Sequence, residues 1–138
     1  MENSEVIRTI RGMLDKDRRY SFEAYRYLVD RLLGDKVVGS HVKTKDLLKK
    51  FKETGIKDFG PLAGMVFEDW GLRSTEDIGN VLRNLVDHRF IYMNANDDFG
   101  DFRDGYDFRE AFNVFPIFGY NKDRDEWSVS YIDIRYKR

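Results

Sequence analysis

Hydrophobic residues recur at helical spacing over the first two thirds of the chain. A helix is predicted from Ser4, its N-cap, to about Lys16, because apolar residues fall three or four positions apart: Val6, Ile7, Ile10, Met13 and Leu14. Four more stripes predict four more helices, which should begin near Ser21, Thr44, Pro61 and Ser74 or Thr75, and end near Gly34, Gly55, Gly71 and His88. We expect the fourth of these five helices to place in the core Leu62, Val66, Phe67 and Trp70.

After these helices the pattern becomes that of strands. Residues 90–93 form a short apolar run, Phe-Ile-Tyr-Met, which predicts a strand. A turn-rich acidic stretch follows, and a short helix is predicted over residues 107–113. The tail predicts a hairpin with arms 115–120 and 127–136. In its second arm the alternation slips in phase at Ile132, which a bulge or a strand covered on both faces would explain.

Together these elements predict one α+β domain over residues 1–138, with about five helices followed by a small β element. Its parts are an N-terminal helical pair (1–34), a middle segment (44–113) and the hairpin (114–138). The element order in 44–108 is similar to that of a winged helix-turn-helix. In that interpretation residues 61–71 and 74–88 form the turn motif, and residues 90–108 form the strand and the wing.

Several short motifs occur in one order between residues 5 and 113. They are Tyr20 to Tyr27; His41-Val42 with Asp46-Leu47-Leu48; Phe59-Gly60-Pro61-Leu62-Ala63; Trp70-Gly71 with Arg73-Ser74-Thr75-Glu76-Asp77; and Asp101-Phe102-Arg103 with Gly105-Tyr106-Asp107-Phe108. In this combination the chain resembles a family of small uncharacterised bacterial proteins of about this length. The resemblance implies no activity, cofactor or catalytic residue, and the tail from Pro116 to Arg138 extends beyond the family's usual end.

Composition narrows the possible functions. The chain has no cysteine, so disulfides, thiolate metal sites and a cysteine nucleophile are excluded. Residues 1–5 lack the pattern of a signal peptide, and no apolar run approaches the length of about 20 residues that spans a bilayer, so we expect a cytoplasmic protein without a membrane partner. The 24 basic and 25 acidic residues are not the clearly basic balance of a nucleic-acid-binding domain.

The acidic stretch after the predicted strand is the best place for metal chemistry. Carboxylates crowded in a loop could hold Ca²⁺ or Mg²⁺, and the candidate ligands are Asp97, Asp98, Asp101 and Asp104. The spacing does not fit an EF-hand, and a solvated loop pinned by its aromatic residues is the competing interpretation. A metal-assisted enzyme built here is one functional hypothesis, although no cofactor is expected.

Other catalytic patterns are missing from the sequence. It contains no Gly-x-Ser-x-Gly elbow, no Walker loop and no Gly-x-Gly-x-x-Gly motif. The two histidines, His41 and His88, have no spacing that requires a shared site. Whether the chain is an enzyme therefore stays open.

A lysine-rich stretch before and within the third helix is the candidate nucleic-acid surface. Its residues could contact phosphates: Lys43, Lys45, Lys49, Lys50 and Lys52. The predicted wing has a net charge of −4 over residues 94–113, which would repel a duplex. The competing interpretation is a solvated helix face.

Aromatic residues reach 15% of the chain, more than a disordered chain would carry. Tyr20, Tyr25 and Tyr27 surround one helix, so we expect that they do not all point inward. Tyrosine is enriched at protein interfaces, and an exposed edge strand can pair with another chain. The candidate interface residues are Tyr120, Trp127, Tyr131 and Tyr136; in the competing interpretation the tyrosines only cover the core with their hydroxyls in water.

These observations favour a non-enzymatic protein–protein interaction module that binds another protein or a second copy of itself. The alternatives are a winged-helix-like nucleic-acid-binding protein and a metal-assisted enzyme that uses the acidic loop.

Overall fold

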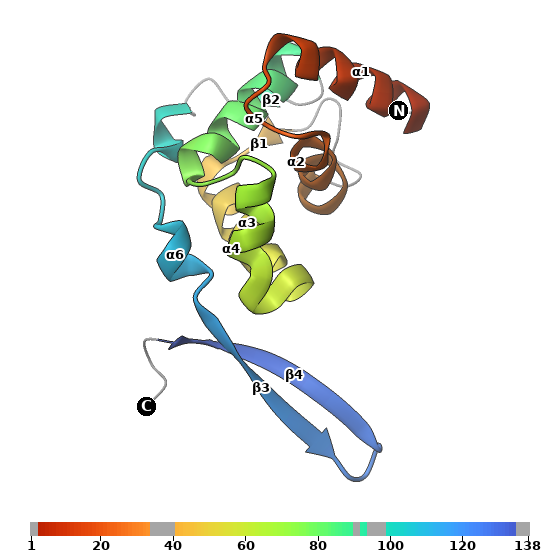
Figure 1. Cartoon of the computed structure of the whole chain (residues 1–138), viewed down its shortest axis with the longest axis vertical. Helices are drawn as coiled ribbons and strands as arrows, with labels where there is room; N and C mark the ends of the chain where they lie inside the picture. The colour runs from red at the N-terminus through yellow and green to blue at the C-terminus, as the bar shows by residue number, and fades with distance from the viewer. Residues whose placement is uncertain (1–2, 34–40, 90–91, 94–98, 135–138) are drawn as a thin grey trace.

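The computed structural model describes residues 3–33, 41–89, 92–93 and 99–134. Helices form a body, and a two-stranded hairpin extends from one end of it (Figure 1), so the predicted α+β class is confirmed. The elements are α1 (Asn3–Lys16), α2 (Phe22–Tyr27), the π-helix η1 (Leu28–Leu33), β1 (His41–Val42), α3 (Thr44–Phe59), the 3-10 helix η3 (Gly60–Leu62), α4 (Ala63–Asp69), α5 (Thr75–Asp87), β2 (Tyr92–Met93), the 3-10 helix η4 (Phe99–Phe102), α6 (Phe108–Ala111), β3 (Val114–Asn121) and β4 (Glu126–Asp133).

A cluster of aromatic rings holds the body together. Phe67 of α4 lies at its centre, with no exposed surface and with its ring centroid 4.5 Å from that of Phe51 in α3. Further rings meet Phe67 at centroid distances of 5.3 to 6.5 Å: Tyr27, Phe59, Trp70, Phe108 and Phe112. Since these rings come from α2, α3, α4, α6 and the residues next to them, the cluster connects α2 and α6 with the helices between them in the sequence.

Two glycines explain where α3 ends. The sequence predicted an end at Gly55, which is wrong, because α3 continues to Phe59. Gly55 lies inside this helix. A Cβ at position 55 would come within 2.7 Å of the Phe67 ring, so the absence of a side chain there makes room for the central ring. Gly60, with a φ of 55°, ends α3 in the left-handed conformation that glycine adopts at least cost.

The next helix ends as its sequence indicates. Gly71 follows α4 with a φ of 94°, and Pro61 stands in the preceding 3-10 turn. Leu62, however, does not enter the core: its side chain is 59% exposed. The chain is still in η3 at this residue, and α4 begins only at Ala63, so Leu62 is off the buried stripe of the helix.

The three tyrosines before and within α2 are all buried, which contradicts the expectation that they cannot all point inward. Each phenol ring lies in the core, and each hydroxyl reaches a polar partner at the margin. The Tyr20 hydroxyl donates to Asp77 at 2.7 Å, and the Tyr27 hydroxyl donates to Asp58 at 2.9 Å. The Tyr25 hydroxyl accepts a hydrogen bond from the amide of Asn84 at 2.8 Å. Packing on more than one side of α2 makes this arrangement possible, and the hydroxyl partners remove the cost of burying a polar group.

Two short strands pair in parallel next to α3 and α5. His41 faces Tyr92 and Val42 faces Met93, which confirms a strand at Tyr92–Met93. The remainder of the predicted strand, residues 90–91, lies outside the described residues. The described part of the predicted wing contains β2 and η4, and its β2 pairs with β1, so the structure adds no support for a wing.

The C-terminal hairpin pairs β3 and β4 antiparallel, from Val114 opposite Asp133 to Asn121 opposite Glu126. The register is continuous over all these pairs, so the phase slip at Ile132 does not come from a bulge. Near the body both Tyr131 and Ile132 are half-buried although they lie on opposite faces, which matches the predicted alternative of a strand covered on both faces. Among the described residues, no helix is long and apolar enough to cross a membrane.

Candidate functional site

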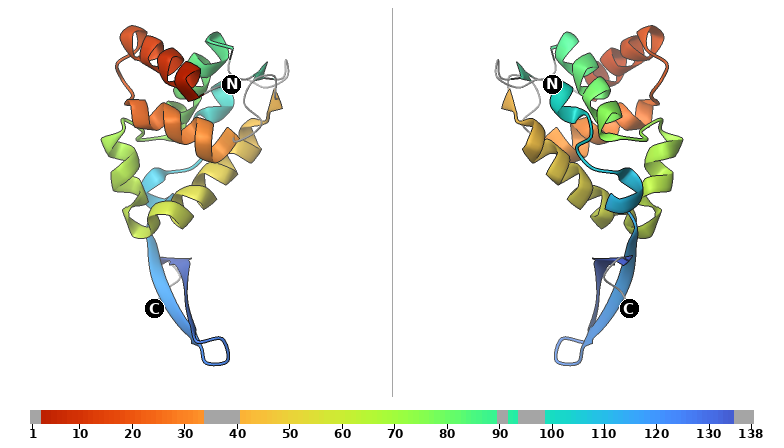
Figure 2. Two further views of the ribbon diagram at one scale, coloured as in Figure 1. Left: turned by 90° about the vertical axis from the view of Figure 1, so that its right-hand side faces the viewer. Right: turned by 90° about the vertical axis from the view of Figure 1, so that its left-hand side faces the viewer.

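The hairpin, called the arm here (residues 114–133), projects away from the helices. Figure 2 shows from both sides that its outer part is not covered by any described helix. The arm is attached at its base, where Val114 is buried and the ring of Tyr131 packs on Gly60 of η3. A Cβ at position 60 would lie 2.9 Å from the Tyr131 hydroxyl oxygen, so the glycine permits this close contact.

The register divides the arm into two faces, because successive side chains of a strand point to opposite sides. One face, called the aromatic face here, is apolar along its length and consists of Pro116, Phe118, Tyr120, Trp127, Val129 and Tyr131. The opposite face has Phe115 and Ile117 near the body but becomes polar toward the tip, with Ser128 and Ser130. The two faces therefore differ most in the outer half of the arm.

Large side chains of the aromatic face lie in solvent. Trp127 is 75% exposed and Phe118 is 69% exposed. Tyr120 stands directly opposite Trp127, and their ring centroids are 5.1 Å apart, so the rings form one surface. Fully burying a phenylalanine side chain is worth about 1.5–3 kcal/mol, which this arm forgoes as a single chain.

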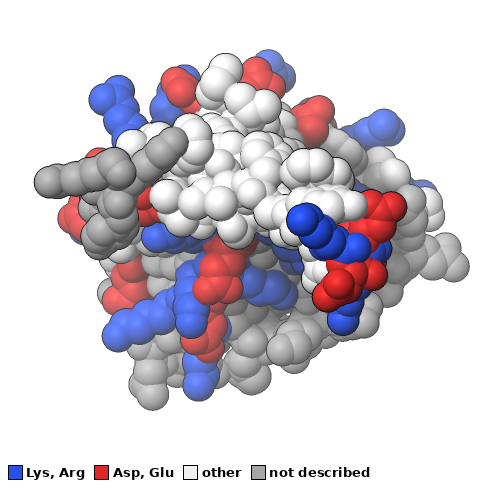
Figure 3. All heavy atoms as spheres, turned by 90° about the horizontal axis from the view of Figure 1, so that it is seen from below, with Lys and Arg blue, Asp and Glu red and all other residues white. Residues whose placement is uncertain are grey.

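Seen from the end of the molecule that carries the arm, uncharged residues form a broad continuous area with charged side chains at its borders (Figure 3). Large exposed apolar patches with polar rims mark interaction sites in soluble proteins. The arm has both properties, since the aromatic face ends at the charged turn of residues 122–126.

The turn at the tip is ordered by its own polar groups. The Asn121 side-chain oxygen accepts hydrogen bonds from the backbone N–H groups of Asp123 and Arg124, at 2.9 and 3.2 Å. The Tyr120 hydroxyl donates to the Asp125 carboxylate, and this hydrogen bond raises the pKa of Tyr120. The end of the aromatic face is thus held in place before any partner binds.

The structure brings together two of the predicted interface residues, Tyr120 and Trp127, and places Tyr131 at the half-buried base of the same face. Tyr136 lies outside the described residues. Sequence reasoning missed Phe118 and Val129, although the alternation of Pro116, Phe118 and Tyr120 in the first arm carried the signal. The pattern of apolar positions there shows one continuous face only when the two strands are aligned, which requires the register.

The acidic stretch does not assemble a metal site among the residues that the structure describes. Asp97 and Asp98 lie outside them, Asp101 and Asp104 are exposed, and no group of three or more His, Asp or Glu side chains converges in the described ranges. The neighbouring residues have a structural role instead: the Thr75 hydroxyl donates to the Phe102 carbonyl at 2.5 Å and accepts from the Gly105 N–H at 3.0 Å.

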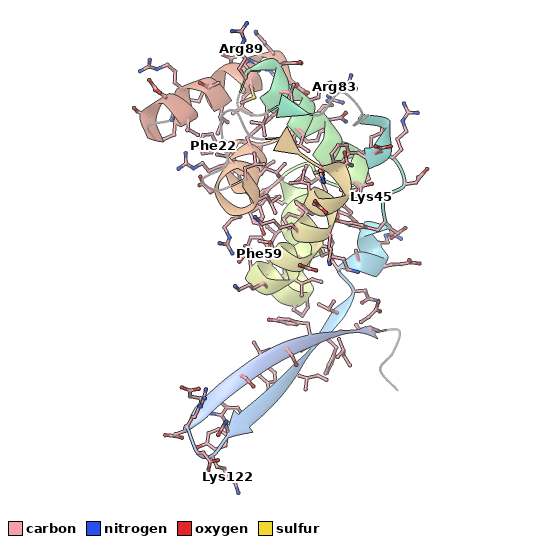
Figure 4. All side chains as sticks on the ribbon, turned by 180° about the vertical axis from the view of Figure 1, so that it is seen from behind. Phe22, Lys45, Phe59, Arg83, Arg89 and Lys122 are labelled. Atoms are coloured by element: carbon pink, nitrogen blue, oxygen red, sulfur yellow. The ribbon has the colours of Figure 1, made fainter. Side chains whose placement is uncertain are left out.

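The candidate phosphate-binding lysines are not equivalent. Lys43, Lys45, Lys49 and Lys50 are exposed, but the ammonium group of Lys50 donates to the Leu32 carbonyl at 2.8 Å, and Lys52 is half-buried. Figure 4 labels Lys45 on the helical body and Lys122 at the tip of the arm, so the lysine surface and the arm's tip are separate regions. Of the two histidines, His88 has its Nδ1 at 2.8 Å from the Asn84 carbonyl oxygen at the end of α5. The side chain of His41 is not among those that the structure describes.

Two hollows lie side by side along α4, the start of α5 and α6, with volumes of about 470 and 540 Å³. They share Arg73, Phe108 and Arg109. Glu76, Asp104 and Asp107 line the first hollow beside the two arginines, so its charges are mixed and select no ligand class.

Comparison with known proteins adds no relative: no protein-family model, no curated protein and no solved structure matches the chain. The resemblance to a bacterial family stays a prediction, and the function has to be argued from the arm itself.

Proposed function

We propose that the chain is a non-enzymatic protein-interaction module and that the arm is its binding element. One observation carries this proposal: the aromatic face presents Phe118, Tyr120, Trp127 and Val129 to solvent on a hairpin that projects from a well-packed body. Among the described residues no helix of the body buries these side chains, so a binding partner would supply their burial.

Polar side chains of the body support the same view. The hydroxyls of Tyr20, Tyr25 and Tyr27 and the carboxylate of Asp58 are engaged in contacts between helices. Arg31 forms two hydrogen bonds with Asp58, at 2.7 and 2.9 Å, and this contact is the main reason that the pKa of Asp58 is lowered. These groups have structural partners within the body, whereas the rings of Phe118 and Trp127 stay mostly exposed among the described residues.

The test is affinity capture from an extract of the source cells, performed with and without nuclease, using three baits. The first bait is the wild-type chain, the second carries Phe118→Ser and Trp127→Ser, and the third carries Met65→Ser. Met65 is a matched control because it is 69% exposed but lies on α4 of the body. We expect a protein that the wild-type and Met65→Ser baits retain and that the arm variant loses; that protein is identified, purified and titrated against all three.

The same capture separates the alternatives. Equal retention by all three baits would contradict the role of the arm. Loss of all retained material on nuclease treatment would instead favour the winged-helix-like nucleic-acid-binding alternative. In that case Lys45→Glu with Lys49→Glu should weaken binding, and this pair is preferable to Lys50, whose ammonium group already binds a backbone carbonyl.

A further inference from the structure

Backbone geometry distinguishes the two outer edges of the arm, neither of which pairs with a further strand among the described residues. Ile134 donates its N–H to the Asn113 carbonyl, and these residues continue the register of the hairpin. Hydrogen-bonded and non-hydrogen-bonded pairs alternate along an antiparallel ladder, so the odd-numbered residues of β3 bond to β4. Trp127, Val129 and Tyr131 of β4 lie opposite even-numbered residues, and their backbone N–H and C=O groups therefore point away from β3.

The β3 edge is blocked and the β4 edge is open. On β3 the outward position 116 is a proline, which has no N–H to offer a further strand. On β4 the segment from Trp127 to Ile132 contains neither proline nor glycine nor charge. A strand added to the arm can therefore pair along β4 but is hindered along β3.

The open edge is also complementary to itself. Residues 127–131 read Trp-Ser-Val-Ser-Tyr, so the residue types are symmetric about Val129. If a second copy pairs antiparallel with Val129 on the two-fold axis, Trp127 faces Tyr131, Ser128 faces Ser130, and Val129 faces Val129 of the second copy. Aromatic pairs, serine hydrogen bonds and β-branched pairs are the cross-strand contacts that stabilise antiparallel sheets.

This register uses the whole strand. Val129 lies next to the middle of β4 (Glu126–Asp133), so the tip of each arm would reach the base of the other, and the two bodies would lie at opposite ends. The paired segment should end before positions 125 and 133. There Asp125 would face Asp133 of the second copy, and like charges directly opposite each other are unfavourable.

The surface area is sufficient for such a contact. A compact monomer of 16.4 kDa exposes about 7,500 Å², whereas this chain exposes 9342 Å². The excess is about 1,800 Å², and each subunit of a standard-sized stable complex contributes only about 800 Å². The surplus is larger than one subunit's share of a dimer interface.

We propose that the partner of the arm is a second copy of this chain, joined through β4 in an antiparallel four-stranded sheet centred on Val129. This inference rests on the proposed function and names the partner. The two aromatic faces would then form one continuous surface, because residues that face each other across an antiparallel pair lie on the same side of the sheet.

Substitutions of opposite charge at Val129, the residue on the two-fold axis, test this arrangement. A residue on the axis faces its own copy, so Val129→Lys and Val129→Glu should each separate the dimer, with dissociation constants raised about tenfold or more. An equimolar mixture of the two variants should restore association, because Lys then faces Glu. Sedimentation velocity over a range of concentrations measures the association of each sample.

Two controls keep the outcome interpretable. Ile117→Lys also adds a charge at an exposed apolar position, but on β3 and on the opposite face, and it should leave association unchanged. Circular dichroism and thermal unfolding establish that every variant remains folded. Variants at Val129 that associate like the wild type, or a mixture that fails to associate, would overturn the self-pairing.

The outcome is separable from that of the proposed function. A wild-type chain that stays monomeric at its highest soluble concentration, yet retains another protein through Phe118 and Trp127, overturns the self-pairing and leaves the interaction module standing. A monomeric chain with no arm-dependent partner overturns both.

Discussion

The body and the arm use the same kinds of side chain in opposite ways. In the body Phe67 is fully buried among rings from several elements, whereas Phe118 on the arm is 69% exposed. The two tryptophans show the same contrast: Trp70 contacts Tyr27, Phe59 and Phe67, whereas Trp127 contacts Tyr120 and is 75% exposed. A ring stabilises the fold only where other elements surround it, and the comparison therefore separates residues that maintain the fold from residues available for binding.

The largest expected effect comes from truncating one ring in each region. Phe67→Ala should lower the free energy of unfolding by about 3–5 kcal/mol, because it leaves a cavity at the centre of the ring cluster. Phe118→Ala should change it by less than about 0.5–1 kcal/mol, since the ring is mostly exposed. Urea unfolding at a concentration where the chain is monomeric measures both, and similar losses for the two variants would contradict the division.

A smaller effect is expected where the two regions meet. Gly60→Ala should destabilise the chain by about 1–3 kcal/mol, because position 60 has a left-handed φ and its Cβ would press on Tyr131. Gly12→Ala is the control: Gly12 lies inside α1 with nothing within 4 Å of a Cβ, so alanine should stabilise by about 0.5–1 kcal/mol. Thermal unfolding should show a lower melting temperature for Gly60→Ala and a higher one for Gly12→Ala. An unchanged melting temperature for Gly60→Ala would show that the contact between position 60 and Tyr131 adjusts without cost.

The smallest effect concerns acid. Asp17 accepts hydrogen bonds from Arg19 and Asn84, and the Arg19 contact above all lowers its pKa well below the ordinary value of 3.8. A carboxylate with a lowered pKa contributes stability above its unfolded pKa, and this stability is lost as the pH falls through about 4 and below. Asp17→Asn should therefore cost about 1 kcal/mol at neutral pH and make the remaining stability less sensitive to acid.

Asp123→Asn in the turn of the arm is the matched control for this acid effect. The Asp123 backbone N–H donates to Asn121, but its carboxylate has no hydrogen bond or ion pair among the described residues. Urea titrations at neutral and acidic pH should give nearly wild-type values for this variant. An acid profile of Asp17→Asn that parallels the wild type would contradict the role of Asp17.

Local signals in the sequence predicted much of the fold. The stripes of apolar residues predicted the helices, and the alternation in the tail predicted the hairpin. Gly55 misled because a glycine inside a helix and a glycine that ends one look alike in sequence; only the Phe67 ring across the core distinguishes them. The three buried tyrosines were missed for the same reason, since their partners Asp77, Asn84 and Asp58 are distant along the chain.

The candidate site was predicted in part. An excess of aromatic residues and a hairpin edge pointed to the tail, and Tyr120 and Trp127 indeed form one surface. The register is needed to place Phe118 on the aromatic face and Pro116 at an outward position of the β3 edge. A single sequence does not specify this register. The parallel pairing of β1 with β2 was not predicted either, because two-residue strands carry almost no pattern.

The placement of the two tryptophans gives the chain a pair of built-in optical reporters. The indole of Trp70 lies within the ring cluster of the body, and the indole of Trp127 lies on the aromatic face of the arm. In Trp70→Phe the remaining tryptophan fluorescence comes from the arm alone, and in Trp127→Phe it comes from the body alone. In the first variant, tryptophan emission that shifts to shorter wavelength would show that a molecule covers the arm. In the second variant, emission that shifts to longer wavelength would show that the core of the body has become exposed to water. Neither measurement needs an added dye.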